Sequence, residues 1–432
     1  MKNARFLAVE LLNKTFMNGG YSNIQLGTGL EKSALDERDK RLCSAIYYGV
    51  IERKITLDYI ISQLSKRNAG KIDLTVLNIL RTGLYQILYM DNIPDNASVN
   101  ESVNLAKAFH KKSASGFVNA VLRNFIRNNK DYAVPRDIFI SSSVKYSAPV
   151  EFIESLINDY GMEKTDILLS DALEVPPVTV RMNTLKENSA DVMEKLGAEK
   201  SDLIPDCYNL KCGDLTVLPE FKSGYFHVQD LSSQLCCMAL NPTENDKVLD
   251  LCSAPGGKAF TMSQLMKNKG EIYAFDLHKK RVDLIKKGAE RLGISNINAM
   301  TGDACVFNEK LPEFSKILCD VPCSGMGVIR RKPEIKYKNF AEFENLPEIQ
   351  YKILENALSY LAVGGELVYS TCTLRKSEND NIIDRLLENH SNIEGIPFLE
   401  KLGEPFGDYK ATIFPDYFGS DGFFISKIRK VR

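Results

Sequence analysis

Two short runs in the last third of the chain each place a cysteine directly after an apolar, β-branched stretch. Residues 315–319 precede the run 320–325, which reads DVPCSG, and residues 366–369 precede the run 370–373, which reads STCT. Stretches of this kind predict buried strands, and open α/β sheets carry their chemistry at the carboxyl ends of the strands. The two runs therefore predict an α/β sheet with two thiols at one edge.

A third loop, residues 250–258 with the sequence DLCSAPGGK, leaves another predicted strand in the same way. A glycine-bearing turn at this place lets backbone N–H groups and a helix N-terminus approach a ligand. A P-loop would need glycine in place of Cys252 and Ser or Thr in place of Ala259, and a dinucleotide site would need GxGxxG. The loop fits neither pattern, and S-adenosylmethionine is the ligand that fits it better.

Acidic residues at the ends of the next two predicted strands also favour a nucleoside cofactor. Asp276 follows the strand 271–275, where it could accept hydrogen bonds from ribose hydroxyls. Asp303 follows the strand 297–301, where it could meet an adenine amino group. Each acid taken alone is more often a turn or cap residue, but their succession after Asp250 indicates a cofactor site.

The two loop thiols differ in setting from cysteines that act only as small apolar side chains, which we expect of Cys236 and Cys237. Cys323 and Cys372 are flanked by small polar residues, where a thiolate can add to an electron-poor carbon. Carbon 5 of cytosine accepts a methyl group only after such an addition at carbon 6. The reaction also needs an acid near N3, for which Asp320 is close, and assistance at release, a role open to Cys323.

The chain divides into three parts by its patterning. Residues 1–140 carry apolar stripes at helical spacing and predict an all-α bundle. Residues 141–230 combine a helix start with an alternating strand at 178–183 and predict a small α+β module. Residues 231–432 alternate strand and helix, which predicts a mostly parallel sheet with helices on both faces. Strands are expected at 247–251, 271–275, 297–301, 315–319 and 366–369, and helices at 279–292 and 346–361.

Basic residues concentrate toward the N-terminus. Residues 1–130 contain 19 Lys and Arg against 11 Asp and Glu, whereas the remainder contains 36 against 45. This asymmetry favours a polyanionic partner, although a solvated surface without a partner has the same composition. Arg181 and Asn183 in the strand 178–183 either contact RNA or tether the strand to a neighbouring domain. Other candidate phosphate contacts are Lys107, Lys111, Lys112, Arg123, Arg127, Arg330, Arg331 and Lys332.

Several classes of protein are disfavoured by what the sequence lacks. It contains no run of eighteen apolar residues and no signal-peptide pattern, so we expect a cytoplasmic protein without a membrane partner. With four histidines and no CxxC pair, we expect no metal site.

Taken together, the three motifs resemble the signatures of RNA (cytosine-5)-methyltransferases of the NOL/NOP/Sun superfamily, and the whole chain resembles the RsmB (Sun/Fmu) family within it. Residues 35–39 and 48–50 also resemble a NusB-type RNA-binding domain. The resemblance implies a NusB-like bundle at 1–140, an RNA-binding or linker module at 141–230 and a Rossmann-like class I methyltransferase domain at 231–432. It implies methylation of carbon 5 of a cytosine in 16S rRNA with S-adenosyl-L-methionine.

The same resemblance implies the roles of individual residues. Cys372 would be the nucleophile, with Cys323 and Asp320 as further catalytic residues. The cofactor would be bound by Cys252, Ser253, Ala254, Pro255, Gly256, Gly257, Lys258, Asp276, Asp303 and Asp320. The partner would be 16S rRNA or a small-subunit assembly intermediate, and we expect a monomer. Two alternatives remain, namely a related enzyme acting on tRNA and a non-catalytic RNA-binding or assembly factor.

Overall fold

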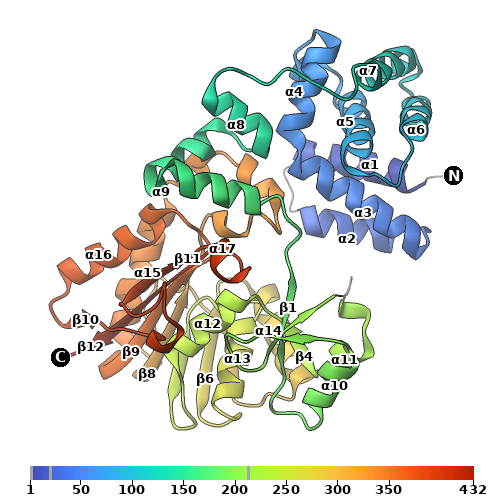
Figure 1. Ribbon diagram of the computed structural model, residues 1–432. Helices are drawn as coiled ribbons and strands as arrows, with labels where there is room; N and C mark the ends of the chain where they lie inside the picture. Colours follow the sequence, from blue (N-terminus) through green and yellow to red (C-terminus); the bar gives the residue numbers. More distant parts are fainter. Residues whose placement is uncertain (1–2, 19–21, 212–214) are drawn as a thin grey trace. The chain divides into compact units, whose positions relative to one another are not determined.

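The computed structural model describes residues 3–18, 22–211 and 215–432 (Figure 1). Contacts between residues divide the chain into two compact units. One unit comprises Met1–Leu173 together with Arg331–Lys338, and the other comprises Glu174–Arg330 together with Asn339–Arg432.

The first unit is a bundle of helices around α5 (Leu74–Tyr89), which is buried along most of its length. Asp73 begins this helix by accepting hydrogen bonds from the backbone N–H groups of Thr75 and Val76. The helix contacts α1, α3, α4, α6 and α7, so it forms the centre of the bundle. The other helices are α1 (Ala4–Asn18), α2 (Ser22–Glu31), α3 (Glu37–Glu52), α4 (Lys54–Ser65), α6 (Asp95–Ala108), α7 (Ser115–Arg127), α8 (Ile138–Tyr146) and α9 (Val150–Asp171).

The segment Arg331–Lys338, from the last third of the chain, completes this bundle. The Tyr337 hydroxyl lies 2.9 Å from the carbonyl oxygen of Ile51 and 3.1 Å from that of Ser147. The Lys336 ammonium, which is also buried, donates to the carbonyl oxygen of Glu52 at 2.9 Å. The helical unit is therefore assembled from two stretches that are far apart in the sequence.

The second unit begins with a small antiparallel sheet of order β2-β3-β1-β4. Its strands are β1 (Val178–Met182), β2 (Glu199–Lys200), β3 (Cys207–Leu210) and β4 (Phe226–Val228). Arg181 and Asn183 are buried, and their side chains act as tethers. Arg181 donates to the side chain of Gln264 at 2.9 Å, and Asn183 donates to the carbonyl oxygen of Leu292 at 2.9 Å. The tethering interpretation of these two residues is confirmed, and neither is exposed for contact with RNA.

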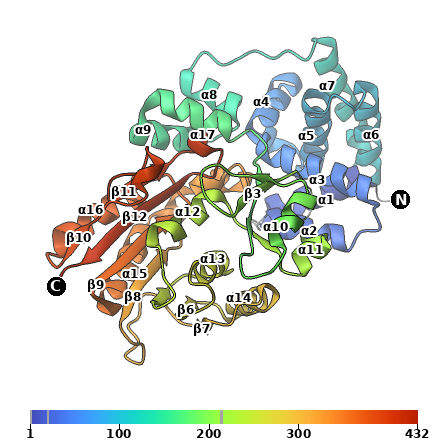
Figure 2. The same cartoon turned by 60° about the horizontal axis from the view of Figure 1, so that its bottom comes forward.

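The larger sheet has the order β10-β12-β9-β8-β5-β6-β7, with β11 paired to β12 (Figure 2). The strands from β9 to β7 are parallel, whereas β12 runs antiparallel to β9. The strands are β5 (Lys247–Asp250), β6 (Glu271–Asp276), β7 (Ile297–Thr301), β8 (Phe314–Asp320), β9 (Leu361–Thr371), β10 (Ile393–Gly395), β11 (Lys410–Ile413) and β12 (Phe423–Lys430).

Helices cover both faces of this sheet because successive strand residues are apolar on both sides. Val248 and Leu318 belong to one core with α12, α13 and α14, whereas Leu249 and Ile317 belong to a second core with α15 and α16. Both sides of a mostly parallel sheet are normally buried in this way. The helices are α12 (Leu231–Leu240), α13 (Gly257–Leu265), α14 (Lys279–Leu292), α15 (Leu346–Tyr360), α16 (Asp380–Asn389) and the short α17 (Pro415–Phe418). Within the described ranges, none of the helices is both long and apolar enough to cross a bilayer.

Candidate active site

A cavity of about 370 Å³ opens where the five parallel strands end. Its lining takes residues from the loop after each strand, so the parallel arrangement gathers side chains from five separate stretches of sequence. The predicted site residues that line it are Cys252, Ala254, Asp276, Asp303, Asp320, Cys323 and Cys372. The other predicted residues, Ser253, Pro255, Gly256, Gly257 and Lys258, belong to the loop after β5 and the start of α13.

Cys323 and Cys372 both line this cavity, and their sulfur atoms are in contact at 3.4 Å. Both side chains are half-buried. The backbone holds the two loops together, since the N–H of Gly327 donates to the carbonyl oxygen of Cys372 at 2.9 Å. The structure thus brings together the two thiols that the sequence motifs single out.

The contact between the two thiols affects the ionisation of Cys323. A hydrogen bond to Cys372 and burial raise the pKa of the Cys323 thiol well above its usual value. A negative charge on Cys372 opposes a second charge on Cys323, because two thiolates in contact repel each other. A charge on Cys372 would therefore hold Cys323 in its protonated form.

Asp320 ends β8 beside the thiols, with both carboxylate oxygens engaged. One oxygen pairs with the Lys258 ammonium at 2.7 Å, and the other accepts a hydrogen bond from the Ser370 hydroxyl at 2.9 Å. Burial alone would lower the pKa of Lys258, but the attraction of Asp320 raises it. The ion pair with Lys258 and the hydrogen bond from Ser370 therefore hold the Asp320 carboxylate in place at the cavity wall.

The loop after β5 is shaped by backbone contacts. Ser253 donates its N–H to the carbonyl oxygen of Phe275 at 2.7 Å, which fixes the loop against β6. Gly256 has φ of 110° and lies where a Cβ would come within 2.4 Å of the Phe260 ring, so only glycine fits. Pro255 is exposed at the turn. These contacts present the N-terminus of α13 toward the strand ends.

Asp276, the last residue of β6, and Asp303, two residues after β7, line the cavity, and each accepts a hydrogen bond from the turn that follows it. Asp276 is buried; it accepts a hydrogen bond from the N–H of His278 at 3.0 Å and pairs with Arg281 at 3.0 Å. Asp303 accepts from the N–H of Cys305 at 2.9 Å. Because a carboxylate can accept several hydrogen bonds, these anchors leave capacity for a ligand.

Buried polar atoms beside the loop test whether S-adenosyl-L-methionine fits. Both carboxylate oxygens of Asp250 and the hydroxyl of Ser253 are buried without a hydrogen-bond partner among the described residues. Native proteins rarely leave such groups unsatisfied. A ligand that carries ribose hydroxyls and an adenine amino group offers donors for the remaining acceptor capacity of Asp276 and Asp303, which line the cavity. The residues present therefore fit this cofactor.

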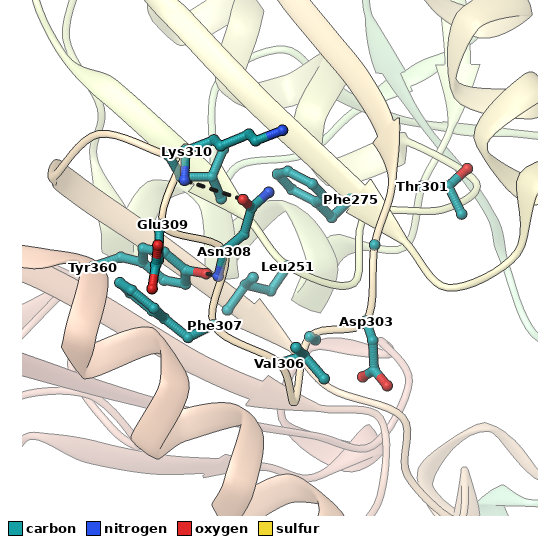
Figure 3. A pocket seen from close by; sticks show the side chains of 13 residues that line it. Leu251, Phe275, Thr301, Asp303, Val306, Phe307, Asn308, Glu309, Lys310 and Tyr360 are labelled. Carbon is teal, nitrogen blue, oxygen red and sulfur yellow. Dashed lines mark hydrogen bonds between the residues drawn. The ribbon is translucent and has the colours of Figure 1, made fainter.

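A second hollow, of about 470 Å³, adjoins the first (Figure 3). Phe307 stacks on Tyr360 in its wall with ring centroids 4.8 Å apart. Asp303 lines both hollows, and Figure 3 shows its side chain extending away from Phe307 and Tyr360. Neither Cys323 nor Cys372 lines this second hollow, so the reacting groups gather in the first.

The candidate phosphate contacts differ in availability. Lys107, Lys112, Arg123 and Arg127 are exposed on the helical unit, whereas Lys111 pairs with Asp73 at 2.7 Å. The prediction for Arg330 is wrong. Its guanidinium is buried and donates to the carbonyl oxygens of Gly419 and Ser420 at 2.9 and 3.0 Å, so it anchors the C-terminal loop. Arg331 and Lys332 are half-buried at the start of the segment that completes the helical unit.

The sequence analysis missed three buried polar residues behind the cysteine loops, namely Gln350, Glu378 and Asn379. They hydrogen-bond the residues that flank Cys323 and Cys372. The only available signal was a Glu–Asn pair that follows the STCT run at the start of an amphipathic helix. Such a pair is also common at ordinary helix starts.

Comparisons with known proteins give matches along the whole chain. Residues 237–429 match the family 16S rRNA methyltransferase RsmB/F, and residues 2–127 match the NusB family. The probable ribosomal RNA small subunit methyltransferase B of Bacillus subtilis is 38% identical over 440 residues, covering 99% of this chain and 98% of the relative. Ribosomal RNA small subunit methyltransferase B of Proteus mirabilis is 30% identical, with 99% of both chains covered.

Solved structures share the fold. The crystal structure of PH0851 matches with a TM-score of 0.83 and 23% identity over 99% of this chain and 98% of that one. NSun6 from Pyrococcus horikoshii, solved with SFG, matches with a TM-score of 0.61 and 23% identity over 66% of this chain and 98% of that one. The predicted fold class is confirmed: a NusB-like helical bundle, a small α+β module and a Rossmann-like α/β methyltransferase domain.

Proposed function

We propose a mechanism for this chain, which belongs to the ribosomal RNA small subunit methyltransferase B family and methylates carbon 5 of cytosine in 16S rRNA with S-adenosyl-L-methionine. In this mechanism Cys372 forms a transient bond to carbon 6 of the target cytosine, and Cys323 assists its release. The observation that carries the proposal is the 3.4 Å approach of the two sulfur atoms in a cavity lined by Asp276, Asp303 and Asp320.

The cofactor, when bound, supplies an electrophilic methyl group. We assign its binding to the loop from Cys252 to Lys258 and to the acids at the strand ends. Asp276 would accept hydrogen bonds from the ribose hydroxyls, and Asp303 would accept one from the adenine amino group. The unpartnered carboxylate of Asp250 supports this assignment, because it lies beside the same loop and needs a donor.

Addition of the Cys372 thiolate to carbon 6 begins the reaction. The new S–C6 bond moves electron density into the ring, so N3 becomes basic and carbon 5 becomes nucleophilic. Asp320, which lines the cavity and pairs with the Lys258 ammonium, would accept a hydrogen bond from N3 once a proton has entered there. Carbon 5 then takes the methyl group.

Release requires loss of the proton from carbon 5 and cleavage of the S–C6 bond. Once Cys372 is bonded to carbon 6, it no longer carries the charge that raises the pKa of Cys323. Cys323 can then release its own proton to water, and its thiolate accepts the proton from carbon 5. The C–H electron pair re-forms the C5=C6 double bond, which breaks the S–C6 bond and expels the Cys372 thiolate. Because the two sulfur atoms are in contact, the charge on Cys372 opposes ionisation of Cys323 until Cys372 has bonded to carbon 6.

We assign RNA contacts to residues 1–140 and 141–230 and methyl transfer to residues 231–432. The exposed Lys107, Lys112, Arg123 and Arg127 are suited to phosphate contacts. The target base must leave its stack to reach Cys372, at a cost of about a few kcal/mol, which favours an unpaired cytosine in rRNA or an assembling subunit. Since one chain supplies the whole cavity, we expect a monomer, and we expect it in the cytoplasm with its ribosomal substrate.

The two alternatives are less well supported. The full-length relatives at 30% identity or more carry names that specify the small ribosomal subunit, which disfavours a tRNA substrate. A non-catalytic assembly factor would gain nothing from two thiols in contact beside an acid and a cofactor-sized cavity.

Methyl transfer by two cysteine variants tests the mechanism. With radiolabelled cofactor and unmethylated 16S rRNA, Cys372→Ala should lose transfer by at least about 1,000-fold, because removal of a nucleophile forfeits the covalent route. Cys323→Ala should instead accumulate a protein–RNA adduct that survives denaturation. Cys43→Ala, which removes a buried thiol of the helical unit, is the control. Normal transfer by Cys372→Ala, or normal turnover without adduct in Cys323→Ala, would reject the assigned roles.

A further inference from the structure

Glu378 holds the Cys323 loop from behind. Its side chain is fully buried, and one carboxylate oxygen accepts hydrogen bonds from the N–H of Ser324 at 2.9 Å and from the Gln350 amide at 3.0 Å. The same Gln350 amide donates to the carbonyl oxygen of Pro322 at 2.9 Å. The residues on both sides of Cys323 are therefore fixed, directly or through Gln350, to one buried carboxylate.

Asn379, the next residue, holds the Cys372 loop in the same manner. Its side-chain oxygen accepts a hydrogen bond from the Thr371 hydroxyl at 2.6 Å, and its side-chain nitrogen donates to the carbonyl oxygen of Thr373 at 2.9 Å. Thr371 and Thr373 are the residues on either side of Cys372. One amide side chain thus fixes both neighbours of the second thiol.

We propose that Glu378 and Asn379 are positioning residues that hold Cys323 and Cys372 in register, so that the two sulfur atoms stay in contact. Because they are consecutive, a shift of either residue moves both loops together. This inference rests on the proposed roles of the two thiols. A direct link between the loops supports it, since the hydroxyls of Ser324 and Thr373 lie 2.7 Å apart.

The charge on Glu378 has a second consequence for the thiols. The hydrogen bond to Cys372 and burial are the main causes of the raised pKa of Cys323, and the Glu378 carboxylate adds to them. A buried negative charge behind Cys323 disfavours a thiolate there. The Glu378 carboxylate, which also pairs with Arg375 at 3.3 Å, therefore adds to the causes that keep Cys323 protonated.

The hydrogen bonds of Glu378 and Asn379 would also be expected if these side chains only stabilised the buried loops. Such a role predicts lost stability after substitution, with the thiols still in register in the folded fraction. The positioning role predicts that the contact between the sulfur atoms is lost while the protein remains folded. The test must therefore read that contact directly.

Oxidation by diamide reads the contact without cofactor or RNA. Two electrons and two protons pass from the thiol pair to the azo group, which becomes a hydrazine, as the sulfur–sulfur bond forms. Peptide mapping by mass spectrometry quantifies the Cys323–Cys372 link. In the full chain, Glu378→Ala and Asn379→Ala should slow this link at least about tenfold, because proximity sets the rate. Their methyl transfer should fall about 100-fold in kcat, with little change in KM for the cofactor.

Glu366→Ala is the matched control. Glu366 is a largely buried carboxylate in the middle of β9, the strand that leads to Cys372, and it pairs with Lys316 and Lys427 at 2.6 and 2.9 Å. Its loss should lower thermal stability as much as Glu378→Ala does, and should leave the rate of the link unchanged. Glu378→Gln retains an acceptor for Ser324 without the charge. In this variant the Cys323–Cys372 disulfide should form at the wild-type rate. Alkylation of Cys323 should begin at a lower pH than in the wild type.

The positioning role, the proposed function and the electrostatic effect of Glu378 are each rejected by a different result. A wild-type rate of linking in folded Glu378→Ala and Asn379→Ala, or an equal loss in Glu366→Ala, would overturn the positioning role. Slower linking together with normal methyl transfer by Cys372→Ala would leave the positioning intact and reject the proposed function instead. An unchanged pH dependence of Cys323 alkylation in Glu378→Gln would remove the electrostatic part of the inference.

Discussion

At the scale of single residues, the acids around the cavity differ in what they contact. Asp320 pairs with Lys258, and Asp276 pairs with Arg281. Asp250 has no such partner; it is fully buried at the end of β5, and burial raises its pKa to about 7. Without a ligand, this carboxyl group is therefore protonated below neutral pH.

In the protein without ligand, Asp250→Asn should change how stability depends on pH. Since the pKa is raised in the folded state, the native protein binds more protons than the unfolded chain between about pH 4 and pH 7. Wild-type stability should fall as the pH rises through that range, by at most about 4 kcal/mol. The neutral amide removes this loss, so the variant should exceed the wild type by more at pH 8 than at pH 5 in urea unfolding. An equal difference at both pH values would contradict the prediction.

At the scale of elements, the loop that carries Cys323 is packed so tightly that one glycine is obligatory. A Cβ on Gly327 would come within 2.0 Å of the carbonyl oxygen of Gly422 and 2.9 Å of that of Cys372. The N–H of Gly422 in turn donates to the carbonyl oxygen of Gly327 at 2.9 Å. The loops after β8 and β9 and the approach to β12 meet at this residue.

Gly327→Ala should therefore lower stability and methyl transfer together. Overpacking at such a contact costs about 1–3 kcal/mol, and the backbone must move away from the Cys372 loop. Gly116→Ala is a suitable control, since Gly116 lies in α7 with open space around it and should change stability by less than about 1 kcal/mol. Thermal unfolding and transfer assays measure both effects. Wild-type transfer by Gly327→Ala would show that the loop tolerates displacement.

The elements that could be predicted are those with a local signal. The helix Lys279–Leu292 agrees with its predicted bounds, because its apolar face is periodic and Gly293 ends it in the left-handed conformation. The strand β9 is longer than predicted, since Gly364 and Gly365 interrupt its apolar pattern. The sequence predicts no strand at β10, β11 or β12, because antiparallel pairing at a sheet edge follows no βα rhythm.

In the candidate site, too, the residues that could be predicted are those with a local signal in the sequence. The thiols and the strand-end acids could be predicted because each directly follows an apolar stretch. Glu378 and Gln350 could not, because their partners Ser324 and Pro322 lie tens of residues away in sequence and no periodicity connects them. The misassigned Arg330 is a related case, since a basic residue in a loop looks the same in sequence whether it meets phosphate or buried carbonyl oxygens.

At the scale of the whole molecule, the chain returns to its helical unit shortly after the Cys323 loop. In the segment Arg331–Lys338, Tyr337 contacts α3 and the end of α8, and the Glu334 carboxylate accepts hydrogen bonds from the N–H and hydroxyl of Ser22 at 3.1 and 2.8 Å. A helical domain cut at residue 173 would lack these contacts. The domain that resembles NusB is therefore completed by a part of the chain outside its sequence match.

A fragment of residues 1–173 should consequently be less stable than the same helices in the full chain. Removing a buried tyrosine costs about 3–5 kcal/mol, so amide hydrogen exchange in α3 and α4 should be faster in the fragment. A peptide of residues 329–340 should restore protection, and the same peptide with Tyr337→Ala should not. Because burial lowers the pKa of Lys336 to about 7, the bound peptide holds fewer protons above that pH, and binding should tighten from pH 7 to pH 9. Equal protection by both peptides, or no protection by either, would show that the helical unit is complete without this segment.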